Sequence, residues 1–177
     1  MPKIKVIETE YRGYKFRSRT EARWAVFFDE IGVLWEYEKE GYDLGGIWYL
    51  PDFWIPDWSS FIEIKGDPMQ LGDALEKCMK LKTMTGERCF VLYGIPDHET
   101  YQMIFPPTEH NGEIYDGIGN PYKILQCRRC PGHWCASVSG EAWGQLGNCS
   151  VECNSDRFPI ESDELIKAHN TAKSYRF

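Results

Sequence analysis

Three residues near the middle of the chain have the types and spacing for metal-assisted chemistry: Asp52, Glu63 and Lys65. Glu63 and Lys65 are two apart in a predicted strand, so they project from one face, while Ile62 and Ile64 project from the other. Antiparallel pairing of this strand with the one that carries Asp52 could bring two carboxylates together, where they repel unless a cation lies between them. Mg²⁺ takes such oxygen ligands and leaves positions for water and phosphate.

Glu21 is a fourth candidate, and two interpretations of it stay open. In the first, Ser18 and Glu21 form a capping box, in which the Glu21 carboxylate reaches back to the Ser18 amide. In the second, Glu21 belongs to the metal site, because it shares a helix face with Trp24, Ala25 and Phe28 and therefore points at the core. A buried carboxylate needs a partner, and a metal ion would supply one.

Elements of regular structure must position these residues, and the hydrophobic pattern predicts most of them. We expect helices at 18–31, 69–83 and 162–173, and strands at 3–11, 15–16, 33–37, 47–55, 61–65 and 89–93, with weaker extended candidates at 101–105 and 122–126. Between positions 18 and 93 the order is therefore helix, three strands, helix, strand.

With this order in place, the motif resembles a known superfamily. Pro51-Asp52, ten intervening residues and Glu63-Ile64-Lys65 are similar to the signature of the PD-(D/E)xK, or restriction-endonuclease-like, nucleases. The resemblance covers about residues 14–95, and the stretches 14–24 and 49–53 also look like a pattern in small phage and bacterial members. It implies an α/β (α+β) fold with an αβββαβ core and a central mixed sheet.

The resemblance also implies an activity, which is hydrolysis of phosphodiester bonds in DNA, more as an endonuclease than as an exonuclease. Mg²⁺ or Mn²⁺ would be held by Glu21, Asp52, Glu63 and the carbonyl of Ile64, and would activate a water molecule. Lys65 would orient that water or help to deprotonate it.

Charge is segregated along the chain, although the net charge is −7. The stretch 11–24 holds five basic residues against one acid, and 121–135 holds three basic residues and no acid. Local patches decide the field that a polyanion meets. We expect contacts to the nucleic-acid backbone from five basic side chains, unless these are merely solvated: Lys15, Arg17, Arg19, Arg128 and Arg129.

Five of the seven cysteines fall within 127–153. Cys127, Cys130, Cys149 and Cys153 have the spacing of two knuckles that close a structural Zn²⁺ site, and His133 or Cys135 could replace one ligand. We therefore predict three regions: a nuclease core at 1–96, an extension with short strands at 97–126, and a small zinc-binding module with a C-terminal helix at 127–177.

Two other functions remain open. The first is a non-catalytic nucleic-acid-binding protein, with a degenerate nuclease core and the zinc module as binder. The second, an HNH-type nuclease in the tail, is disfavoured because the histidines there lack the strand-then-helix context of that motif. No apolar run is long enough for a membrane span and no signal peptide is evident, so we expect a cytoplasmic protein that binds DNA and no membrane. A homodimer is compatible with cleavage of both strands.

Overall fold

The structure is a computed structural model that describes residues 7–106, 108–110, 113–115, 121–127, 133–138, 141–146 and 160–177. Its helices and strands, in chain order, are β1 (Thr9–Tyr11), β2 (Tyr14–Phe16), α1 (Arg19–Glu30), β3 (Glu36–Tyr37), β4 (Tyr42–Asp43), β5 (Trp48–Tyr49), β6 (Phe53–Ile55), β7 (Ser60–Lys65), α2 (Leu71–Thr85), β8 (Arg88–Tyr93), β9 (Met103–Ile104), β10 (Thr108–His110), β11 (Glu113–Tyr115), β12 (Lys123–Gln126), β13 (Trp134–Val138), β14 (Glu141–Gln145) and α3 (Asp163–Ser174).

A five-stranded mixed sheet forms the centre of the molecule, with the strand order β3-β6-β7-β8-β9. Strands β3, β6 and β7 pair antiparallel, and β8 pairs parallel with β7 after the crossover through α2. The mixed α/β class and the central mixed sheet predicted from the sequence are therefore confirmed. The order α1, β3, β6, β7, α2, β8 also appears as expected, with the hairpin β4–β5 inserted between β3 and β6.

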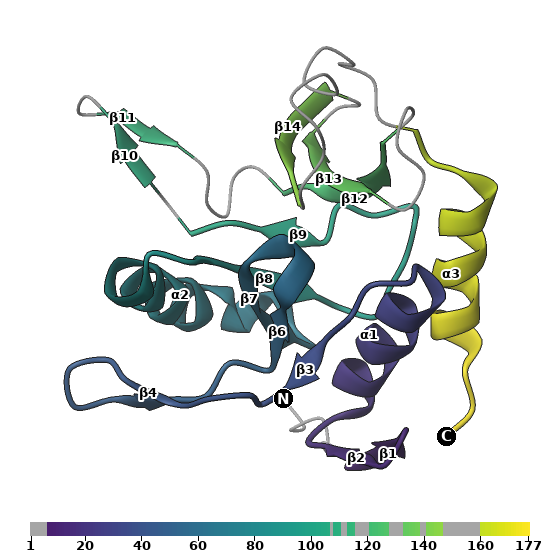
Figure 1. Cartoon of the computed structure of the whole chain (residues 1–177), viewed down its shortest axis with the longest axis horizontal. Coiled ribbons are helices and arrows are strands. Elements are labelled where there is room, and N and C mark those ends of the chain that lie inside the picture. The colour runs from purple at the N-terminus through teal and green to yellow at the C-terminus, as the bar shows by residue number, and fades with distance from the viewer. Residues whose placement is uncertain are drawn as a thin grey trace.

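Helices cover both faces of this sheet, with α1 and α3 on one side and α2 on the other (Figure 1). The two faces form separate hydrophobic clusters, because neighbouring strand residues point to opposite sides. In β7, Ile62 and Ile64 belong to the cluster that contains α1, whereas Phe61 belongs to the cluster that contains α2. Glu63 shares the parity of Phe61, so its face of the strand is the one packed against α2 and not a solvent-exposed face.

The expected strand over 47–55 is wrong as one continuous element. It is divided into β5, which pairs with β4, and β6, which pairs with β7. Pro51 lies at the break, and proline cannot donate to a strand ladder. The next residue, Asp52, accepts the backbone N–H of Ile64 through its side chain at 2.7 Å. The break therefore places the carboxylate where a ladder bond would otherwise lie.

The three helices begin and end close to the predicted positions. Ser18 caps α1 and Ser162 caps α3, each accepting a backbone N–H through its hydroxyl oxygen. Gly86 ends α2 in the left-handed conformation at φ 77°, which glycine adopts without a steric penalty. Helix α3 packs along α1, where His169 lies against Phe27. In the part of the chain described here, no helix has the length and apolar character needed to cross a membrane.

Candidate active site

The register of β6 and β7 brings the predicted acidic residues together. Phe53 pairs with Ile62 and Trp54 pairs with Phe61, so the next position of the register sets Asp52 opposite Glu63. The N–H of Ile64 points at Asp52. Because the N–H and C=O of one strand residue point to the same edge, the Ile64 carbonyl faces this edge as well.

Asp52 is the most deeply buried of the three acids. It is 2% exposed, its Oδ2 accepts the Ile64 N–H, and its Oδ1 accepts a hydrogen bond from Arg17 at 2.5 Å. Burial raises the pKa of Asp52 well above its usual value, and the nearby charges of Glu63 and Glu21 raise it further, against the opposing effects of the Ile64 N–H and Arg17. Three carboxylates therefore share one electrostatic environment.

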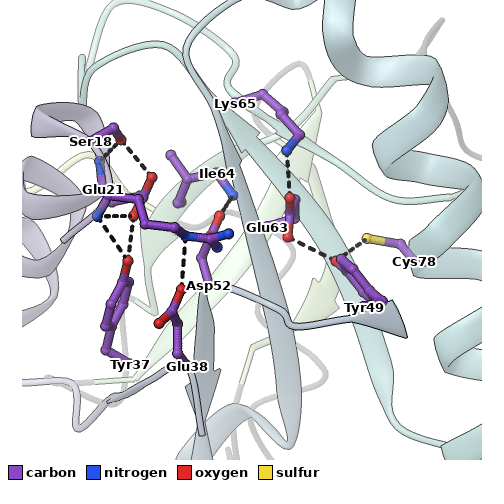
Figure 2. A network of polar contacts seen from close by, with 11 residues as sticks. Ser18, Glu21, Tyr37, Glu38, Tyr49, Asp52, Glu63, Ile64, Lys65 and Cys78 are labelled. Carbon is purple, nitrogen blue, oxygen red and sulfur yellow. Dashed lines mark hydrogen bonds and ion pairs between the residues drawn. The ribbon is translucent and has the colours of Figure 1, made fainter. Parts of the chain in front are cut away.

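Glu63 lies in a second set of contacts, shown on the right of Figure 2. Lys65 Nζ donates to Oε1 of Glu63 at 2.5 Å, and the Tyr49 hydroxyl donates to Oε2 at 2.9 Å. Glu63 and Lys65 therefore lie on the same face, as predicted. Burial would lower the pKa of Lys65, but the charge and hydrogen bond of Glu63 raise it overall. The Lys65 side chain is therefore a cation at neutral pH.

Glu21 is 7% exposed, and the capping interpretation describes its contacts, with one correction. Ser18 accepts the Glu21 N–H and donates its hydroxyl to Oε1 of Glu21 at 2.7 Å. The backbone N–H that Glu21 accepts belongs to Arg17, at 3.2 Å, and not to Ser18. Tyr37 donates to Oε2 at 2.7 Å. The buried carboxylate thus has protein partners, although its charge still acts on Asp52.

A common pattern links the three carboxylates. One oxygen of each accepts a neutral donor from the scaffold: Tyr37 for Glu21, the Ile64 N–H for Asp52, and Tyr49 for Glu63. The second oxygen of Asp52 and of Glu63 accepts from a cation, Arg17 or Lys65. The neutral donors orient the carboxylates, and the cations compensate their charge.

This donor set fits a hard divalent cation in its chemistry, because it offers the carboxylate oxygens of Asp52 and Glu63 and the carbonyl of Ile64. Within the described ranges, however, no group of three His, Cys, Asp or Glu side chains is arranged to hold a metal ion. A cation at Asp52 and Glu63 would compensate the same charge that Arg17 and Lys65 compensate.

Of the five basic residues expected to contact nucleic acid, the structure describes Lys15, Arg17 and Arg19. Two of these three are paired with acids. Arg17 bridges Asp52 and Glu38, with Nε 2.8 Å from the Glu38 carboxylate, so it belongs to the acidic site. Lys15 is exposed and pairs with Glu8. Arg19 and Arg23, by contrast, form no ion pair with an acid in the part of the chain that the structure describes.

Arg23 is a residue that the sequence interpretation left out of the site. It lies one helical turn after Arg19, and burial together with the Arg19 charge lowers the pKa of its guanidinium. Its Nε is buried without a hydrogen-bond partner among the described residues. Like charges four apart on a helix repel each other, so these two arginines are poorly compensated by the residues that the structure describes. The four-residue spacing of Arg19 and Arg23 was the signal in the sequence that could have identified Arg23.

Tyr37 and Tyr49 were also missed. Both are aromatic residues in predicted strands, which is the ordinary composition of a core strand. Only the tertiary structure shows that their hydroxyls meet Glu21 and Glu63 (Figure 2).

The predicted zinc site lies mostly outside the described residues, because three of its four cysteines do: Cys130, Cys149 and Cys153. Arg128 and Arg129, predicted to contact phosphate, lie outside them as well. Cys127 is described, and its N–H donates to the carbonyl of His133 at 2.8 Å. Cys135 is buried, and its thiol donates to the Leu125 carbonyl. Burial raises the pKa of Cys135 to about 12, which disfavours the thiolate form that zinc binds.

Comparisons of the chain with protein-family models, with curated proteins and with solved structures found no match.

Proposed function

We propose that this protein is a metal-dependent nuclease of the PD-(D/E)xK type that hydrolyses phosphodiester bonds in DNA. The observation that carries the proposal is that Asp52, at the start of β6, is acted on by the charges of two further buried carboxylates, Glu63 and Glu21, with Lys65 paired to Glu63. Asp52, Glu63 and Glu21 are 2%, 6% and 7% exposed. Buried carboxylates oppose folding unless they are compensated, so a cluster of this kind is expected at a functional site.

In the reaction, water attacks phosphorus, one phosphorus–ester bond breaks, and the leaving oxygen takes a proton. Asp52 and Glu63, with the Ile64 carbonyl, would hold Mg²⁺ or Mn²⁺, which supplies an acidified water and stabilises charge on the phosphate. Lys65, on the same face as Glu63, would orient this water or help to deprotonate it, and its ammonium would stabilise charge on the phosphate.

Arg17, in this proposal, compensates Asp52 and Glu38 rather than contacting the substrate backbone. Arg19 and Arg23 are the stronger candidates for phosphate contacts, since each lacks an acidic partner within the described parts of the chain. Such contacts increase affinity in a salt-dependent manner and carry no sequence information. The cysteine-rich segment would add a structural Zn²⁺ site, to which Arg128 and Arg129 would contribute further phosphate contacts.

A second candidate function is a non-catalytic nucleic-acid-binding protein. One observation favours it: Asp52 and Glu63 are already paired with Arg17 and Lys65. A core that had lost catalysis could be stabilised by these ion pairs alone. The retention of both acids and of Lys65 in one site favours the nuclease.

A cleavage assay separates the two functions. The purified chain is incubated with plasmid and with single-stranded DNA in Mg²⁺, in Mn²⁺ and in EDTA. The nuclease proposal expects cleavage with either metal, none in EDTA, and none after the double substitution Lys65→Ala and Asp52→Ala. Lys80→Ala is the matched control, because Lys80 also pairs with a glutamate, Glu76, but does so on the partly exposed surface of α2.

Cleavage that persists in the double variant would overturn the assignment of the site. Binding without cleavage under every metal condition would instead support the second function.

A further inference from the structure

We propose that Tyr49 is a positioning residue that engages one oxygen of Glu63, disfavours bidentate binding of a cation by that carboxylate, and so biases the site toward Mg²⁺ and away from Ca²⁺. This inference rests on the proposed function, because it requires a divalent cation at Asp52 and Glu63.

Tyr49 contacts Glu63 directly. Tyr49 is buried, and its hydroxyl donates to Oε2 of Glu63 at 2.9 Å, with the sulfur of Cys78 3.9 Å from the same hydroxyl. A tyrosine hydroxyl ordinarily titrates at about pH 10, so it remains a hydrogen-bond donor to Glu63 at neutral pH.

Two of the four carboxylate oxygens of Asp52 and Glu63 already accept a buried hydrogen bond. Oε2 of Glu63 is engaged by Tyr49, and Oδ2 of Asp52 is engaged by the Ile64 N–H. Oε1 of Glu63 and Oδ1 of Asp52 instead face the cationic side chains of Lys65 and Arg17. A metal ion that takes the place of these cations reaches one oxygen of each carboxylate first, and the buried donors compete with it for the other oxygen.

Mg²⁺ and Ca²⁺ prefer different numbers and arrangements of oxygen ligands. Mg²⁺ is small and octahedral, and commonly uses one or two carboxylates while keeping several waters. Ca²⁺ takes six to eight oxygens at longer distances, often with a bidentate carboxylate. A hydroxyl that competes with bidentate binding by Glu63 therefore disfavours Ca²⁺ more than Mg²⁺.

The hairpin holds Tyr49 in place. Tyr49 pairs with Tyr42 across β4 and β5, and the Tyr42 ring lies 5.5 Å from that of Phe61 in the cluster under α2. Tyr37 repeats the arrangement at Glu21, where its hydroxyl engages Oε2. The ring of Tyr49 is thus held in the cluster under α2 and not by its bond to Glu63 alone.

The test compares Mg²⁺ and Ca²⁺ binding to the full chain by calorimetry, without DNA, for wild type and Tyr49→Phe. Phenylalanine removes only the hydroxyl and frees Oε2, so the ratio of Mg²⁺ to Ca²⁺ affinity is expected to fall about tenfold or more, as for other residues that orient metal ligands. Tyr42→Phe is the matched control: it removes a hydroxyl from the same hairpin, but one that bonds to Glu40 in an exposed contact, and it should leave the ratio unchanged.

An unchanged ratio in a cooperatively folded Tyr49→Phe protein overturns the inference and leaves the proposed function intact. If that variant does not fold, Tyr49→Met, which fills the space with a flexible apolar side chain, provides the same comparison. Asp52→Asn is measured in parallel. Binding to wild type that Asp52→Asn does not weaken, or no binding of either ion to wild type at millimolar concentration, overturns the metal site on which both proposals depend.

Discussion

His169 is expected to make the folded protein sensitive to mild acid. It is 5% exposed, stacks on Phe27 with ring centroids 4.4 Å apart, and its Nδ1 is buried without a hydrogen-bond partner among the described residues. Burial, and then the charge of His98, lower the pKa of His169 from 6.5 to about 4, with Lys123 acting in the same direction and Asp97 against it.

The direction in which pH changes the free energy of unfolding follows from proton linkage. Because the folded protein holds His169 neutral, the unfolded chain binds the proton more readily between pH 6.5 and pH 4. The contribution is complete above the unfolded pKa and is lost as pH falls toward the folded pKa. With 1.36 kcal/mol per pKa unit, the loss in unfolding free energy is about 2 kcal/mol at pH 5 and about 3 kcal/mol at pH 4.

The assay is urea denaturation at pH 7 and at pH 5 for wild type and His169→Phe. Phenylalanine keeps a ring on Phe27 and does not titrate, so the drop between the two pH values should be smaller in the variant by about 2 kcal/mol. His98→Gln is the control, since it removes a neighbouring histidine but leaves His169 buried, and should retain most of the drop. If the unfolding free energy falls equally in wild type and His169→Phe between pH 7 and pH 5, His169 is not the source of the acid sensitivity.

Three further predictions concern the site and the metals. Asp52→Asn should not lower the melting temperature at pH 7 in EDTA, because the raised pKa of Asp52 means that its charge opposes folding there; a clearly lower melting temperature would contradict this. Ser18→Ala should destabilise the protein by about 1 kcal/mol in urea denaturation, since it removes the cap of α1 and one donor to Glu21; no change would show that the cap is dispensable. Metal analysis after dialysis should find about one zinc per chain, lost in Cys127→Ser, as expected for a four-ligand structural site; less than about half an equivalent in wild type would count against it.

Much of the fold follows from local sequence signals. The helix caps at Ser18 and Ser162 and the glycine that ends α2 are short-range features, and the structure bears them out. The inward parity of Ile62 and Ile64 follows from the alternation of a strand. An interruption of the 47–55 segment at Asp52 could be expected from the sequence, but its division into two strands with different partners could not, because aromatic residues favour a strand on both sides of Pro51.

The partners of the site depend on contacts between distant parts of the chain. Arg17 reaches Asp52 across 35 positions, and Tyr49 reaches Glu63 across 14. Neither contact has a local signature, since an arginine before a helix is typical of a solvated surface and a tyrosine in a strand is typical of a core. The acidic residues could be predicted because their motif is short in sequence, whereas the groups that compensate and orient them could not.

We propose that Asp52, together with Glu63 and Lys65, performs metal-dependent hydrolysis. The most direct measurement is the single-turnover rate of DNA cleavage in Mg²⁺ for wild type and Asp52→Asn, with folding of both checked by thermal denaturation. We predict cleavage by wild type that EDTA abolishes, and a rate that falls about a hundredfold or more in the folded variant. Equal rates in the two proteins, or no cleavage by folded wild type with any divalent metal, would contradict the account.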